Sequence, residues 1–170
     1  CGEDRATGVL GPTAESTSTT AATPVTPPAT ATTTSTTVNL IECPTNQTQS
    51  TQSLLGLLGG IVRLDGSSVR VPFGALSLPT LISLEIPASK YVEVDVTAND
   101  LLSFLFNKPV TITIDYSRCN RSDILQAPLT VWYIDSVTKE PLQNMGGVDD
   151  KLRRRITFTT DHLSTYAIAF

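Results

Sequence analysis

The chain has 170 residues, of which 40% are hydrophobic, 6% aromatic and 16% charged, and its formal net charge is −4. The basic residues are scattered apart from Lys151 and the run Arg153 to Arg155, which argues against nucleic acid as a partner. No apolar run approaches the roughly 20 residues of a membrane-spanning helix. The three cysteines and the single histidine are too far apart in sequence to predict a metal site.

The chain starts Cys1-Gly2-Glu3-Asp4 without an initiator methionine, and we interpret Cys1 as a processed N-terminus. This start, followed by a Thr/Pro-rich stretch, resembles a mature bacterial lipoprotein, in which a signal peptidase cuts just before a cysteine that then carries lipid. The resemblance implies a covalent lipid on Cys1, with more than one acyl chain, as stable anchoring requires. It also implies a place in the bacterial cell envelope, on the periplasmic side or at the cell surface. An ordinary terminal cysteine is the alternative.

Residues 12–37 consist almost entirely of Thr, Ser, Ala and Pro. All aromatic residues lie at or beyond Phe73, so the N-terminal segment lacks the apolar area that would offset its ordering entropy. We predict that residues 1–41 form an extended irregular tether, in which a segment of about 35 residues would reach about 110 Å at polyproline II rise. Residues 42–170 then form the folded domain. An O-glycosylated stalk would have the same composition.

Cys43 and Cys119 remain once Cys1 is assigned to the lipid. In an exported protein they can form a disulfide, which would disfavour the unfolded chain by about 4 kcal/mol. The bond would fix the point where the tether meets the domain. Two free thiols are the alternative.

Apolar residues alternate with polar ones from Gly60 onward, with a period of two rather than 3.6. Short runs with one apolar face predict an all-β fold, an antiparallel two-sheet β-sandwich. The segment 99–106 is apolar on several sides and is either a helical turn or a buried strand. Trp132 is expected in the core between the two sheets, and an aromatic side chain that binds a partner at the surface is the alternative. Turns are expected at these segments: 65–67, 87–89, 119–123, 146–147 and 149–150.

Several segments between Gly59 and Phe170 resemble the ZU5 domain. They are the opening Gly59-Gly60-Ile61-Val62-Arg63-Leu64, the turn Val71-Pro72-Phe73-Gly74-Ala75-Leu76, the run Phe106-Asn107-Lys108-Pro109-Val110, and the closing segment 156–167. The family is a β-sandwich related in architecture to immunoglobulin-like folds. The resemblance implies a module for protein binding or for contacts between domains.

His162-Leu163-Ser164 is the segment with a candidate chemistry. Residues two apart on a strand share a face, so His162 could assist attack of the Ser164 hydroxyl on the Leu163 carbonyl, and the chain would cleave itself. The tripeptide resembles the self-cleavage sequences of some ZU5-containing proteins. The alternative is that His162 and Ser164 begin the last strand and Tyr166 is a hydrogen-bonded corner residue. A turnover enzyme is not expected, since the chain lacks a phosphate loop and clustered catalytic carboxylates.

Lys151, Arg153 and Arg155 are expected to open a strand, with Arg153 and Arg155 on the face opposite Ile156. Such residues usually form a solvated edge that prevents pairing between chains. The alternative is a site for an acidic partner or a lipid headgroup.

These observations predict a non-catalytic, lipid-anchored protein of the cell envelope. We expect an accessory or scaffolding subunit that binds and braces a membrane-associated protein complex, for example a respiratory, photosynthetic or transport complex. One alternative is a free-standing adhesin or carbohydrate-binding surface module, which would need an exposed aromatic platform. The other is a domain that cleaves itself between Leu163 and Ser164.

Overall fold

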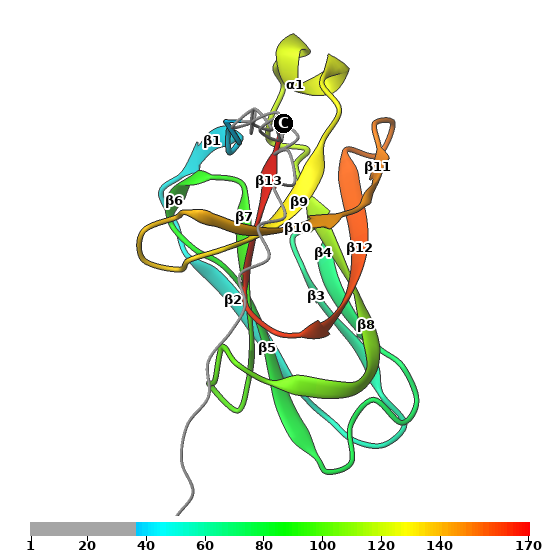
Figure 1. The fold of residues 1–170 in the computed structure, drawn as a ribbon. Coiled ribbons are helices and arrows are strands. Elements are labelled where there is room, and N and C mark those ends of the chain that lie inside the picture. Colours follow the sequence, from blue (N-terminus) through cyan, green and yellow to red (C-terminus); the bar gives the residue numbers. More distant parts are fainter. Residues whose placement is uncertain (1–36) are drawn as a thin grey trace, which may run out of the picture. The chain divides into compact units, whose positions relative to one another are not determined.

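Alternating apolar side chains build strands along most of the chain in the computed structural model, which describes residues 37–170 (Figure 1). The strands are β1 (Glu42–Thr45), β2 (Gln49–Leu55), β3 (Gly60–Leu64), β4 (Ser67–Val71), β5 (Thr80–Ile86), β6 (Ser89–Tyr91), β7 (Glu93–Ala98), β8 (Leu105–Asp115), β9 (Thr130–Ile134), β10 (Pro141–Gly146), β11 (Val148–Asp150), β12 (Arg155–His162) and β13 (Thr165–Ala169). One short helix, α1 (Ser122–Gln126), lies between β8 and β9. Cys1 and nearly all of the predicted tether lie outside the described residues.

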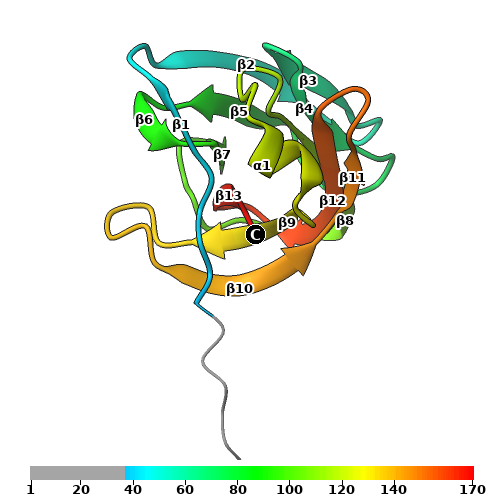
Figure 2. The same cartoon turned by 90° about the horizontal axis from the view of Figure 1, so that it is seen from above.

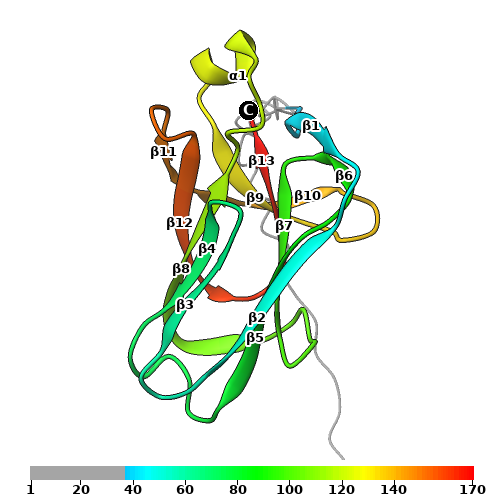
Figure 3. The same cartoon turned by 180° about the vertical axis from the view of Figure 1, so that it is seen from behind.

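The strands form two main antiparallel sheets. One has the order β10-β9-β13-β7-β5-β2 and the other the order β11-β12-β8-β4-β3, while β1 and β6 form a small separate pair. Viewed from behind, the two main sheets face each other as two layers (Figure 3). The predicted all-β, two-sheet antiparallel sandwich is therefore confirmed.

The core lies between the inner faces of these sheets. On β5, Ile82 and Leu84 are fully buried, and on β8 Ile112 is fully buried on the facing sheet. The intervening residues of each strand point outward, which is the alternation that the sequence shows. The helix α1 contributes Ile124 to this core. Within residues 37–170, no helix is long and apolar enough to cross a membrane.

The chain enters and leaves the domain at one end. Asn39 and Phe170 exchange two backbone hydrogen bonds, at 3.3 and 3.1 Å, so the pairing starts slightly before residue 42. The helix α1 and the C-terminus lie at this end, which Figure 2 views from above. We call it the proximal end. The opposite end, formed by the β2–β3, β4–β5 and β7–β8 loops, is called the distal end (Figure 1).

Trp132 is not in the core between the sheets, as expected from the sequence, but half-buried on the outer face of its sheet. Its neighbour Val131 belongs to the core, so Trp132 points the other way, beside Ala167 of β13. Its indole nitrogen donates to the Thr130 hydroxyl at 3.1 Å. Because Val131 to Ile134 are all apolar or aromatic, the pattern did not say which face is inside.

Three other local predictions are corrected. The segment 99–106 is mainly a turn, since Asn99 and Asp100 have φ of 50° and 64°, and β8 begins at Leu105. The predicted turn 119–123 contains the start of α1. Asp149 and Asp150 lie on β11 rather than in a turn.

Candidate functional site

Exposed apolar side chains gather at the distal end of the domain. Each is between 40% and 82% exposed, and together we call them the apolar tip: Leu54, Leu57, Leu58, Phe73, Leu78, Leu101, Leu102 and Leu105. They come from the end of β2, the three distal loops and the first residue of β8, which lie together in the lower part of Figure 1. Monomeric proteins rarely expose so many large apolar residues together without a binding partner.

Backbone hydrogen bonds hold the first two loops of the apolar tip. Gly74 N donates to Leu57 O at 2.8 Å, which ties the β4–β5 loop to the β2–β3 loop. Gly74 has φ 75°, and Gly59 has φ 71° with no room for a side chain against the backbone of Val71. The turn directs Ala75 into the core, where it is 1% exposed. The glycines therefore keep the backbone close, and neighbouring side chains such as Phe73 project outward.

The third loop is closed in the same way. Asn99 N donates to Leu81 O at 2.8 Å, and the Asn99 side-chain oxygen accepts from Leu81 N at 3.0 Å. Ala98 and Leu101 exchange two backbone hydrogen bonds, both at 3.0 Å. Asn107 N donates to Ala75 O, which joins the start of β8 to the β4–β5 loop. Several backbone groups of the distal loops thus have hydrogen-bond partners within the protein.

Charge is almost absent from the apolar tip. Within residues 53–62, 72–82 and 99–107, the only charged residue is Asp100. Three basic residues border these segments: Arg63, Arg70 and Lys108. The Lys108 ammonium donates to Phe73 O at 2.9 Å and lies 5.6 Å from the centre of the Phe73 ring. By contrast, the ion pairs of Arg121, Arg153 and Arg155 lie toward the proximal end, in α1 and around the turn between β11 and β12.

The apolar tip was not among the sites predicted from the sequence. A signal was present, because leucines flank Gly56 and occur in pairs between predicted strands, where polar residues are usual. Their grouping at one end depends on the chain topology, which brings three loops distant in sequence together.

His162, Leu163 and Ser164 line a groove of about 540 Å³. The self-cleavage hypothesis placed His162 and Ser164 on one strand, and the alternative placed them at the start of the last strand. Neither placement is correct, because β12 ends at His162 and β13 begins at Thr165. The His162 ring nitrogen Nδ1 lies 3.2 Å from the Thr160 hydroxyl and 3.1 Å from an Asp161 carboxylate oxygen. The structure thus places His162 beside Thr160 and Asp161, and self-cleavage stays a prediction.

Tyr166 closes this strand junction as a corner residue. Its hydroxyl donates to His162 O at 2.6 Å, and its side chain is fully buried. Burial raises the pKa of Tyr166 to about 12, so the hydroxyl is protonated at neutral pH and can donate this hydrogen bond.

Cys43 and Cys119 form a disulfide with a Cα–Cα distance of 5.6 Å. The bond joins β1 to the segment after β8 at the proximal end. Arg118 reinforces it by donating to Cys43 O at 3.1 Å and to Tyr91 O at 3.0 Å.

The three predicted basic residues do not form one strand face. Lys151 and Arg153 lie in the turn between β11 and β12, and only Arg155 is on the strand. Each is paired with a carboxylate: Lys151 with Asp149 at 2.6 Å, Arg153 with Asp150 at 2.8 Å and Arg155 with Asp115 at 2.8 Å.

Two of these residues also have structural contacts. Lys151 donates to the Ile124 and Ala127 carbonyl groups and so holds α1. Burial alone would raise the pKa of Asp115, but hydrogen bonds from Ser117 and Arg155 outweigh it and hold that pKa below its ordinary value.

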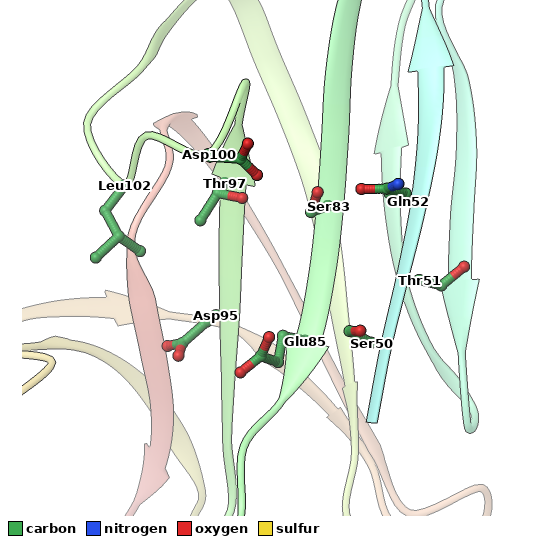
Figure 4. Close-up of a pocket in the computed structure, with 9 residues that line it drawn as sticks. All are labelled: Ser50, Thr51, Gln52, Ser83, Glu85, Asp95, Thr97, Asp100 and Leu102. Carbon is green, nitrogen blue, oxygen red and sulfur yellow. The ribbon is translucent and has the colours of Figure 1, made fainter. Parts of the chain in front are cut away.

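A polar pocket of about 680 Å³ lies on the outer face of β2, β5 and β7 (Figure 4). Glu85 and Asp95 are directly opposite each other on neighbouring strands, with no Lys or Arg in the lining. Burial raises the pKa of Asp95, and the Glu93 carboxylate contributes to the rise while Lys139 opposes it. The sequence analysis did not single out these acids, although they alternate with buried residues.

Comparison with known proteins adds no relationship to these observations. No protein-family model matches the chain, and no curated protein matches it either. The ZU5 and lipoprotein resemblances therefore stay expectations, and the class that the structure defines is an antiparallel β-sandwich with an apolar distal end.

Proposed function

We propose that this protein is a non-catalytic, lipid-anchored binding subunit of the bacterial cell envelope, which braces a membrane-associated protein complex. The observation that carries the proposal is the division of the domain into two ends. The chain enters at the proximal end, beside Phe170, and the exposed apolar side chains lie at the distal end. Such a domain can be held at one end and make contacts with the other.

The proximal end supports a mechanical role. The Cys43–Cys119 disulfide lies a few residues after the point where the chain enters, and Arg118 bridges β1 and β6 next to it. A pull on the N-terminal segment would therefore act on a covalently closed part of the domain. A lipid on Cys1, on the periplasmic side or at the surface, would use this attachment.

An adhesin or carbohydrate-binding module receives less support. Within residues 37–170 the exposed large aromatic side chains are Phe73 and Phe170, and they lie at opposite ends of the domain. Stacking on sugar rings needs aromatic faces grouped on one surface, which these two residues do not provide.

The proposal is tested by detergent phase partitioning of the native protein and of Cys1→Ser, expressed with its natural export signal. We expect the native protein in the detergent phase with a partner protein, and Cys1→Ser in the aqueous phase. The same phase for both proteins would contradict the lipid anchor. A native protein without any partner would contradict the role as a subunit.

A further inference from the structure

We propose that the apolar tip inserts into the interface of a lipid bilayer, as a membrane contact separate from the lipid on Cys1. The inference deepens the proposed function, on which it rests for the presence of a membrane. The occupant is a lipid surface, and the contact surface consists of the eight exposed side chains of the three distal loops and their flanks.

The composition of the apolar tip favours lipid over a protein partner. Seven of its eight residues are leucine and the other is Phe73. Binding energy between proteins is concentrated in Trp, Tyr and Arg, whereas leucine is under-represented at such positions. None of those three types is in the apolar tip. Lipid needs no matching hydrogen bonds, and its affinity grows with the apolar area that is buried.

Several peptide groups of the distal loops already have the hydrogen-bond partners that insertion into a bilayer requires. Peptide groups that lose water there must have partners in the protein. Hydrogen bonds of this kind join Gly59 to Gly56, Gly74 to Leu57 and Ala98 to Leu101. Leu58, which at 82% is the most exposed residue of the apolar tip, lies on the loop closed by the bond between Gly59 and Gly56.

The few charges are compatible with a shallow insertion. Lys108 lies over the Phe73 ring and next to the apolar tip, where a long side chain can extend its ammonium toward the headgroups. With Asp100 as the only charge within the loops, there is no strong basic patch that would select anionic lipid. We therefore expect binding to depend weakly on salt.

The geometry allows the domain to reach a membrane with its distal end. β8 runs from the distal to the proximal end with 11 residues, and a straight strand of this length spans at most about 36 Å. The 36 residues before Thr37 would span about 110 Å if they were extended. This length is sufficient for a chain anchored at Cys1 to bring the apolar tip to the same bilayer.

The test is co-sedimentation of the full chain carrying Cys1→Ser with phosphatidylethanolamine/phosphatidylglycerol vesicles and with phosphatidylcholine vesicles. Because this chain has no lipid and no partner, its result is independent of the tests of the proposed function. We expect binding to both kinds of vesicle, and Leu58→Glu should weaken it about tenfold or more. The matched controls Leu152→Glu and Val137→Glu also change exposed apolar residues, 97% and 85% exposed, but outside the apolar tip. Both should bind like the parent chain.

A second measurement locates the insertion. In the same chain, the fluorescence of Leu58→Trp should be quenched by brominated lipids, over the constant background of Trp132. The fluorescence that Val137→Trp adds should not be quenched. No vesicle binding, or equal loss in Leu58→Glu and in the controls, would overturn the proposal. The proposal would also be overturned if the chain bound a protein from membrane extracts but no vesicles, and if Leu58→Glu abolished the binding of that protein.

Discussion

Tyr166 shows how one hydroxyl stabilises a junction between two strands. It is fully buried, and its O–H donates to His162 O at 2.6 Å, where β12 ends. Tyr166→Phe removes this bond without changing the packing of the ring against Phe158. We expect a loss of about 1–2 kcal/mol in the free energy of unfolding, measured by urea denaturation. Tyr91→Phe is the control and should change stability by less than about 0.5 kcal/mol. Equal effects would contradict this role.

Asp95 makes a pH-dependent contribution to stability. Its pKa is raised above the ordinary value of 3.8 in the folded protein, mainly by burial. Below that value the carboxyl group is protonated in both states, so it causes no penalty. As the pH rises through the folded pKa, the group ionises in an unfavourable place and stability is lost.

Asp95→Asn should therefore raise the urea midpoint at pH 7 and leave it nearly unchanged at pH 3. The control Asp100→Asn lies on an exposed turn of the same pocket and should have little effect at either pH. A lower midpoint for Asp95→Asn at pH 7 would mean that the ionised carboxylate is stabilising.

Single residues also show where sequence reasoning succeeded and failed. Alternation identified Ile112 and Ile114 as core because polar residues separate them. It misplaced Trp132, whose neighbours on both sides are apolar. It also predicted one strand through His162 and Ser164. In the structure the Thr160 hydroxyl hydrogen-bonds to both N and O of His162, and the strand ends there. The alternating pattern contains no sign of these bonds.

Among the elements, the Cys43–Cys119 disulfide joins β1 to the segment before α1 across 76 residues of chain. If the bond stabilises by restricting the unfolded chain, its removal should cost about 4 kcal/mol. The double variant Cys43→Ser/Cys119→Ser should lose this amount in urea denaturation, and reduction of the native protein should give a similar loss. Alkylation of the unreduced protein should leave both cysteines unlabelled, and labelling of both would contradict the bond.

The strands were predictable from the sequence, but the arrangement of their loops was not. Period-two patterns located β5, β8 and β12 because each strand has one buried face. The apolar tip depends on how β2, β4 and β7 end at the same side of two different sheets, which is a property of topology. Similarly, Arg153 looked like a strand residue until the turn between β11 and β12 separated it from Arg155.

The whole molecule would combine two membrane contacts with one folded domain. A lipid on Cys1 would hold the chain, and the apolar tip would fix the orientation of the sandwich at the bilayer. The lateral faces of the domain would then remain available to a protein complex. One of these faces carries the acidic pocket of Glu85 and Asp95 along β2, β5 and β7, which borders the apolar tip at Leu102 (Figure 4).

The most direct test of the proposed function is the intact mass of the native protein, gently extracted from membranes, with co-purifying chains identified in the same experiment. We expect a mass raised by a diacylglycerol and an acyl chain, together with a protein partner in fixed ratio. An unmodified mass without a partner would contradict the proposed function. Loss of the last seven residues would instead show cleavage before Ser164.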